Sequence, residues 1–297
     1  MALTDNILSF AIPATNCRGR VVRLGPALDE ILAAHTYPPV IRDILAEAVC
    51  LTAMLGALLK DEGSQLTLQA QTEAGVINLL ACDYKDGALR GYVDFDRERL
   101  ASQPQEPSLM ALFGQGYLAI TFDLPHPRGR NQGIVPLEGA SLAEAVQNYF
   151  FQSEQIPTLI RVAIDESDGR ISAGGLLVQH LPEGEEGRER LHVQLDHPEW
   201  EHVEIMGSSI TPAELTEATL PLEDILWRLF SESDEVRVLS GKPCVKGCRC
   251  NEDHIRDVIA RFPKEDKEDM VDKEGNIAID CAFCSKTFLI TQASLNN

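Results

Sequence analysis

Residues 244–284 read CVKGCRCNEDHIRDVIARFPKEDKEDMVDKEGNIAIDCAFC and decide the fold of the C-terminal part. They contain two close cysteine pairs, which are Cys248 with Cys250 and Cys281 with Cys284. Zinc prefers four soft ligands at the corners of a tetrahedron, and each pair supplies two sulfurs from one tight turn. A helix expected between the pairs can bring the turns together. The four cysteines therefore predict a zinc site.

Two neighbouring residues compete as ligands, because Cys244 and His254 each lie within four residues of the first pair. We rank both below Cys248 and Cys250, and the role of Cys244 stays open. The other interpretation is that the cysteines are ordinary buried apolar residues. Two tight thiol pairs in a charged, glycine-containing segment argue against it.

A C-terminal segment of this size has little core of its own, so a metal is expected to supply the missing stability. Binding of zinc to a small site contributes on the order of 10–16 kcal/mol, tied directly to folding. Oxidation of the thiolates removes the ligands and is thereby coupled to unfolding. Lys242, Lys246 and Arg249 either favour the thiolates or only balance the charge of the site.

The charge and cysteine content limit the possible partners and compartment. The chain has 297 residues, eight cysteines and a formal net charge of -20, which disfavours binding to nucleic acid. No signal peptide is evident in MALTDNILSF, and the apolar stretch from Val40 to Leu59 contains three charges. We therefore expect a cytoplasmic protein without a membrane span, in which clustered cysteines are metal-binding or redox-active.

Hydrophobic periodicity predicts an α+β chain. A helix is expected over residues 27–60 with a break at Tyr37-Pro38-Pro39, and Cys50 within it is expected to be core. Ser141 and Glu144 predict a capping box at a second helix. Strands are expected over residues 3–23, 65–95 (turning at Asp86-Gly87), 117–122, 133–137, 159–164 and 171–180.

Composition changes at Leu181, where the charged segment PEGEEGRER begins. Short helices are expected beyond it, over residues 199–205, 211–218 and 222–230, the last with an apolar stripe. The prediction is therefore a sandwich-like N-terminal α/β domain (residues 1–181), a helical linker (182–240) and a small C-terminal zinc-binding domain (241–297).

Motifs of common enzymes are missing from the sequence, which has no P-loop, no G-x-G-x-x-G and no H-E-x-x-H. Two alternatives to a redox switch stay open. One is a thiol oxidoreductase that uses Cys281 and Cys284, although zinc would block that nucleophile. The other is a constitutive zinc-ribbon module that binds protein or nucleic acid.

Four further motifs and the cysteine spacing point to one family. The motifs are QGIVPLEG (132–139), YFFQSEQIPT (149–158), AGGLLVQ (173–179) and ILWRLF (225–230). Together they span nearly the whole chain, which resembles the heat-shock protein 33 family of bacterial, redox-regulated holdase chaperones. Cys244 departs from the core cysteine motif of that family.

The resemblance implies a stress-response chaperone that is not an enzyme and needs no ATP. It implies that the reduced form holds one zinc ion through Cys248, Cys250, Cys281 and Cys284 and is inactive. Oxidation would form the disulfides Cys248–Cys250 and Cys281–Cys284, release zinc, unfold the switch and expose apolar surface. Unfolding client proteins are then the expected partners, and the oxidised form is expected to be a homodimer.

Overall fold

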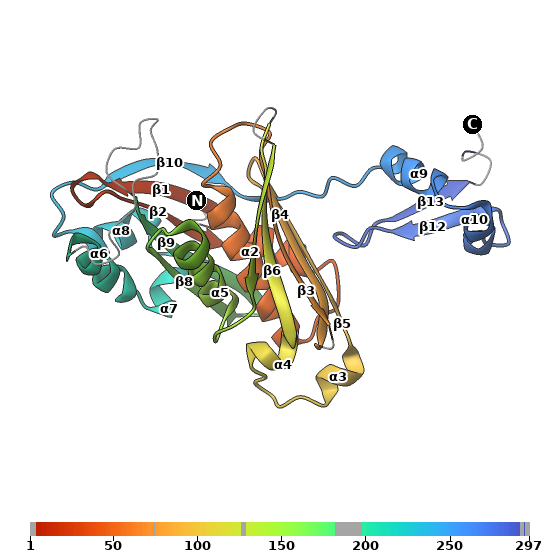
Figure 1. Ribbon diagram of the computed structural model, residues 1–297, viewed down its shortest axis with the longest axis horizontal. Coiled ribbons are helices and arrows are strands. Elements are labelled where there is room, and N and C mark those ends of the chain that lie inside the picture. The colour runs from red at the N-terminus through yellow and green to blue at the C-terminus, as the bar shows by residue number, and fades with distance from the viewer. Residues whose placement is uncertain (1–3, 74, 126–128, 182–197, 292–293, 295–297) are drawn as a thin grey trace.

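Two large β-sheets and a small hairpin organise the computed structural model, which describes residues 4–73, 75–125, 129–181, 198–291 and 294 (Figure 1). The five-stranded sheet has the order β10-β1-β2-β9-β8. Its strands are β1 (Asn6–Ile12), β2 (Cys17–Leu24), β8 (Thr158–Ser167), β9 (Arg170–His180) and β10 (Arg237–Pro243).

The six-stranded sheet has the order β11-β5-β4-β3-β6-β7 and is antiparallel except for the parallel pair β11 and β5. Its strands are β3 (Gln65–Glu73), β4 (Ile77–Lys85), β5 (Ala88–Phe95), β6 (Gln115–Asp123), β7 (Arg130–Pro136) and β11 (Val245–Lys246). The short helices α3 (Arg97–Ala101) and α4 (Leu109–Phe113) connect β5 to β6.

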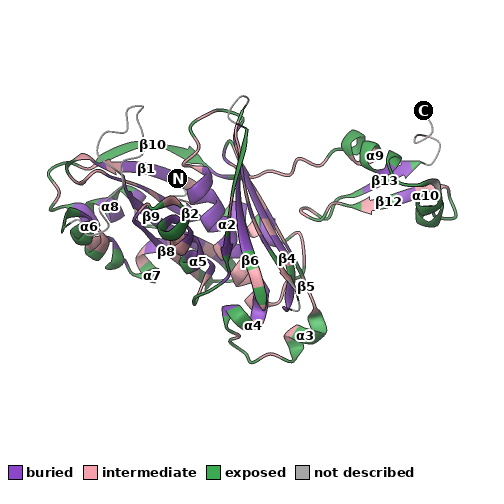
Figure 2. Ribbon diagram, in the orientation of Figure 1, coloured by how far each residue is buried: buried purple, intermediate pink, exposed green. Residues whose placement is uncertain are grey.

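Helix α2 (Pro39–Gly56) lies between the two sheets and contacts strands of both. Pro38 is extended and precedes Pro39 at the first helical position, so the chain breaks between α1 (Pro26–Leu32) and α2 as predicted. Apolar and small residues on all sides of α2 are buried, Cys50 among them (Figure 2). The predicted sandwich-like α+β architecture is therefore confirmed, and helix α2 forms the layer between its two sheets.

Three helices cover the opposite face of the five-stranded sheet, namely α6 (Pro198–Ser208), α7 (Pro212–Thr216) and α8 (Leu222–Phe230). The apolar stripe of α8 is buried there, and Phe230 lies 5.7 Å from Phe10 between ring centroids. Thr211 and Glu214 form a complete capping box at α7. The helices predicted beyond Leu181 are thus confirmed, whereas the segment 182–190 lies outside the described residues.

One buried arginine joins these helices to the sheet. Arg23 on β2 is fully buried, and its guanidinium donates to the backbone carbonyls of Glu214 at 2.9 Å, Leu215 at 2.9 Å and Leu220 at 2.5 Å. Burial lowers the pKa of Arg23 from its ordinary value. A planar guanidinium can satisfy several carbonyls at once, so this single side chain holds the α7–α8 segment in place.

The structure differs from the sequence-based expectations in several places, three of which concern the two large sheets and α5. Strand β10 was not expected, and it extends the five-stranded sheet by pairing with β1. Strand β7 begins at Arg130 rather than at Gly133. Ser141 does cap α5 (Leu142–Tyr149), but Glu144 accepts from the amide of Ala140, so the second half of that capping box is not formed.

No helix in the described ranges is both long and apolar enough to cross a membrane. Helix α2 contains most of the apolar stretch from Val40 to Leu59, and its charged residues Arg42, Asp43 and Glu47 are half-buried. The last of them, Glu47, lines a cavity of about 480 Å³ together with residues of α5 and β8.

Glu47 anchors α5 to α2, because its carboxylate accepts a hydrogen bond of 2.9 Å from the amide of Ala143. Burial raises the pKa of Glu47 from 4.5 to about 7, against the opposing effect of the amides of Ala143 and Leu142. The folded state thus binds this proton more tightly than the unfolded state does. The resulting cost to stability is absent below pH 4.5, grows until about pH 7 and stays constant above it.

We expect Glu47→Gln to stabilise the fold at pH 8, because the amide keeps an acceptor oxygen without a charge. The gain in the free energy of unfolding should be on the order of 3 kcal/mol at pH 8 and vanish near pH 4.5. Urea unfolding at both pH values measures it. The exposed Glu144 provides the control Glu144→Gln, and an equal gain at both pH values would contradict the assignment.

Candidate metal centre

The C-terminal module consists of α9 (Glu252–Ala260), α10 (Lys264–Met270) and the hairpin of β12 (Asn276–Asp280) and β13 (Thr287–Thr291). It lies to one side of the two large sheets (Figure 1). Among the described residues of the module, four are buried in its hydrophobic core, which are Ile259, Ile277, Phe288 and Ile290. So small a core leaves the module dependent on another source of stability.

Each cysteine pair lies in a turn at an edge of this module. Cys248 and Cys250 precede α9, whose start is fixed by Asn251, since its side chain accepts from the amide of His254 at 2.7 Å. Cys281 and Cys284 occupy the turn between β12 and β13. That turn closes through a hydrogen bond of 2.8 Å from the amide of Ser285 to the carbonyl of Cys281.

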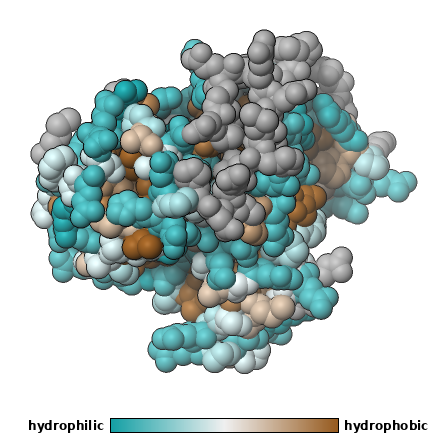
Figure 3. Space-filling view, turned by 60° about the vertical axis from the view of Figure 1, so that its left-hand side comes forward, coloured by the Kyte–Doolittle hydropathy of each residue, from teal (hydrophilic) through white to brown (hydrophobic). Residues whose placement is uncertain are grey.

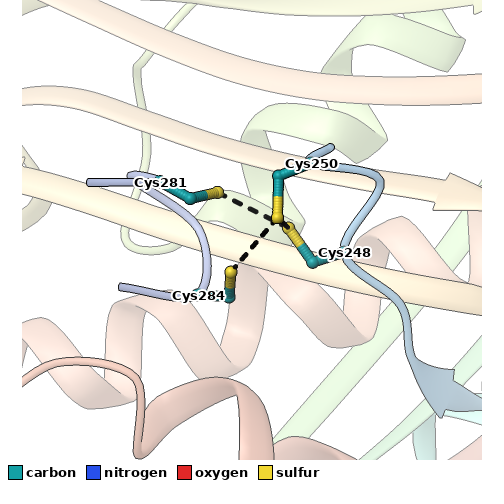
Figure 4. A group of neighbouring side chains, drawn as sticks. All are labelled: Cys248, Cys250, Cys281 and Cys284. Carbon is teal, nitrogen blue, oxygen red and sulfur yellow. Dashed lines mark hydrogen bonds between the residues drawn. The ribbon is translucent and has the colours of Figure 1, made fainter. Parts of the chain in front are cut away.

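The four sulfurs, here called the thiol cluster, converge on one point (Figure 4). The Sγ–Sγ distances are 3.3 Å between Cys248 and Cys250, 3.5 Å between Cys248 and Cys281, and 3.5 Å between Cys250 and Cys284. All four ligand atoms lie within 4.8 Å of one another. A tetrahedron with metal–sulfur bonds of about 2.3 Å has edges of about 3.8 Å, so the donor set and its spacing fit a metal ion.

All eight cysteines are free thiols, and the distances within the cluster are well above the roughly 2.05 Å of a disulfide. Burial works to raise the pKa of Cys248, but hydrogen bonds from the Cys250 amide and from neighbouring thiols outweigh it and lower the pKa to about 7. The pKa of Cys281 is raised, chiefly by burial, although the amides of Cys284 and Phe283 point at its sulfur and act in the opposite direction. Such backbone donors stabilise thiolates, the form that binds metals and reacts with oxidants.

The two competing ligands lie outside the cluster. Cys244 is buried in the N-terminal core, where its amide donates to the carbonyl of Asp5 at 2.8 Å and burial raises the pKa of its thiol to about 12. His254 is exposed on the first turn of α9. Cys17, Cys50 and Cys82 are buried as well, and burial raises the pKa of each thiol.

The two turns that carry the thiol cluster also contact the six-stranded sheet, and the sequence did not predict this contact. Arg249 binds Asp83 on β4 at 2.8 Å, and Phe283 packs against Tyr92 on β5. Asp83 is an isolated acidic residue on an alternating strand, and nothing in the sequence singles it out. Of the three basic residues near the cysteines, Arg249 is thus engaged with a carboxylate of the N-terminal domain.

Comparison with known proteins places the chain in a family. The model described as "Hsp33 protein" matches residues 5–291. The "33 kDa chaperonin" of Caulobacter vibrioides is 38% identical over 294 residues, covering 96% of this chain and 94% of that protein. The "33 kDa chaperonin" of Nitrosococcus oceani is 33% identical and covers 96% and 90%.

A solved structure shares the fold. It is the crystal structure of the 33 kDa chaperonin, a heat shock protein 33 homolog, from Thermotoga maritima. The TM-score is 0.80 at 22% identity, with 98% of this chain and 96% of that chain covered. Two large sheets, a helical segment and a terminal cluster of four cysteines thus define a protein of the 33 kDa chaperonin class. The chain belongs to the Hsp33 family.

We expect the reduced protein to contain one metal ion per chain and Cys284→Ser to lose it, because three thiolates hold a metal far less tightly than four. Cys244→Ala should keep the metal, since Cys244 lies in the other core. Elemental analysis of the purified proteins measures both. Metal loss from Cys244→Ala in a folded protein would contradict the assigned ligand set.

Proposed function

We propose that this chain is a redox-regulated, ATP-independent holdase chaperone whose switch is one zinc ion held by Cys248, Cys250, Cys281 and Cys284. The observation that supports the proposal most strongly is a cluster of four thiols in a module whose described part has a core of four buried apolar residues. Membership of the Hsp33 family and the names of the curated relatives support the chaperone activity. When bound, zinc supplies the cross-link that the module's small core lacks.

Oxidation by a peroxide consumes the ligands in pairs. A thiolate attacks one peroxide oxygen and breaks the O–O bond, which yields a sulfenic acid and hydroxide. The neighbouring thiol then attacks the sulfenic sulfur and expels water. Formation of each disulfide thus removes two electrons from the protein, and these electrons reduce one peroxide molecule. The proposed pairs are Cys248–Cys250 and Cys281–Cys284, each formed within one turn.

Loss of the ligands unfolds the C-terminal module in this proposal, and the linker helices then loosen. The surface they cover is strongly apolar and includes Phe10, Leu176 and Val178 of the five-stranded sheet and Trp200, Leu226 and Phe230 of the helices. Surface of this kind binds unfolding proteins once it is exposed. On the face shown in Figure 3, the described residues are mostly hydrophilic, with hydrophobic ones in small separate groups.

The acidic composition fits a holdase, because a net charge of -20 opposes the aggregation of protein–client complexes. It also disfavours nucleic acid as a partner. The proposal includes a cytoplasmic location, no membrane association and a homodimer as the oxidised form.

A thiol oxidoreductase remains the second candidate, since Cys281 and Cys284 form a close pair. Two described features weigh against it. Both thiols belong to the four-sulfur cluster, and the pair lies in the turn of a two-stranded hairpin rather than at the start of a helix in a βαβ unit. Efficient turnover in an insulin-reduction assay would favour the enzyme.

We expect peroxide at a mildly raised temperature to release one zinc ion, remove four free thiols and switch on suppression of client aggregation. A metal-binding dye, a thiol count and light scattering of a heated client measure the three changes in one sample. Aggregation suppression that is equal with and without oxidant would contradict the proposal.

We expect Arg23→Gln to loosen the linker without oxidation. The substitution removes donors from three carbonyls and should lower the stability of the α7–α8 segment by about 2–4 kcal/mol. Hydrogen exchange of residues 212–230 measures the loosening, and reduced Arg23→Gln should show partial chaperone activity. Arg228→Gln is the control, because Arg228 pairs with Glu214 at the surface of the same segment. If residues 212–230 of Arg23→Gln were as protected from hydrogen exchange as those of the wild type, this role of Arg23 would be contradicted.

A further inference from the structure

The residues that separate the paired cysteines all contact the N-terminal domain. Arg249 separates Cys248 from Cys250, whereas Ala282 and Phe283 separate Cys281 from Cys284. We call these three the spacer residues. Arg249 contacts β4, Phe283 contacts β5 and Ala282 contacts the loop after α1. The loops that supply the sulfurs therefore also contact the N-terminal domain.

The first contact is an ion-pair network on the outer face of the sheet. Arg249 donates to Oδ2 of Asp83 at 2.8 Å, and Arg90 donates to the same oxygen at 2.7 Å. The other carboxylate oxygen accepts from the hydroxyl of Thr67 at 2.7 Å. The side chain of Asp83 is only 5% exposed, so this is a shielded pair whose disruption leaves a poorly solvated charge.

The second contact is aromatic. The guanidinium carbon of Arg90 lies 4.0 Å from the ring centroid of Phe283, a cation–π distance. The ring of Tyr92 meets Phe283 edge-on with centroids 6.3 Å apart. Arg90 therefore joins the first and second contacts, since it touches both Asp83 and Phe283.

The third contact is a pair of hydrogen bonds to the loop after α1. Nε2 of His35 lies 2.6 Å from the carbonyl oxygen of Ala282. The hydroxyl of Ser285, next to Cys284, donates to the carbonyl of Ala34 at 2.6 Å. These bonds fix the backbone of the Cys281–Cys284 turn, whereas the ion pair fixes the Cys248–Cys250 turn.

Two sets of contacts thus fix the positions of the two turns. One set is the thiol cluster, and the other is the contacts of the spacer residues and Ser285 with the N-terminal domain. Docking requires the turns to have the relative position that the thiol cluster gives them, because Arg249 and Phe283 come from different turns and are linked through Asp83, which binds Arg249, and Arg90, which binds Asp83 and packs on Phe283. Conversely, the docked turns help to keep the four sulfurs within 4.8 Å of one another.

We propose that docking of the spacer residues on Asp83, Arg90, Tyr92 and His35 sets the oxidant threshold of the switch. The inference rests on the redox function proposed above and adds its regulation by the N-terminal domain. Coupling between two binding events is reciprocal. If metal binding favours the docked position, docking raises metal affinity by the same factor and slows capture of the thiolates by peroxide.

The test uses the reduced, full-length protein and substitutions that lie on the N-terminal side of the contact. His35→Ala removes the bond to Ala282, and Asp83→Asn removes the charge that holds Arg249. We expect both variants to release zinc about 5- to 30-fold faster than the wild type at a fixed peroxide concentration. Asp123→Asn is the matched control, because Asp123 pairs with Arg130 on the far strands of the same sheet at 2.5 Å and should release zinc like the wild type.

A second measurement separates a positioning role from general destabilisation. Asp83→Asn should add less acceleration in an Arg249→Gln background than in the wild type, because part of its effect acts through Arg249, whereas fully additive effects would assign it to the stability of the sheet. Hydrogen exchange of residues 281–286 in reduced His35→Ala should also rise, with residues 65–73 unchanged.

The outcomes distinguish this inference from the proposed function. The threshold role would be overturned, and the redox switch left intact, if zinc were released at the same rate from the wild type, His35→Ala and Asp83→Asn. Unchanged exchange of residues 281–286 in His35→Ala would likewise overturn the docking. Wild type that holds no metal would overturn the proposed function, and the exchange measurement would still decide whether the spacer residues dock.

Discussion

The convergence of four sulfurs from two distant turns is the constraint on which the C-terminal part of this protein depends. Among the described residues, the core of this module has four buried apolar side chains, with a few half-buried ones packed against it. The thiol cluster adds a direct link between the chain before α9 and the turn after β12. In the proposed function these sulfurs are both the metal ligands and the atoms that oxidants attack, which would couple folding to redox state in the same atoms.

The rest of the molecule is built in layers around helix α2, and the outer layers are the parts that the proposed coupling would release. Helix α2 fills the space between the two sheets, and the linker helices cover the far face of the five-stranded sheet. The outer face of the six-stranded sheet receives the turns of the thiol cluster at β4 and β5. Each covering element is smaller than the α2-centred core and is therefore the part expected to open first.

Two arginines illustrate how polar side chains join these layers. Arg23 is fully buried and satisfies three carbonyls of the linker, whereas Arg90 joins a shielded carboxylate to the aromatic ring of Phe283. Neither contact is made within one element, and both connect segments far apart in the chain. A guanidinium suits this task because it donates in several directions from one plane.

The sequence by itself determined the features that depend on local spacing. Two tight cysteine pairs predicted the four sulfurs that the structure brings together, alternation predicted β3 and its neighbours, and Tyr37-Pro38-Pro39 predicted the break before α2, because each signal lies within a few residues. Only the tertiary structure decided which distant groups meet. It excluded Cys244 from the cluster, paired β10 with β1 and placed Asp83 against Arg249, since such contacts arise from chain topology and leave no periodic trace in the sequence.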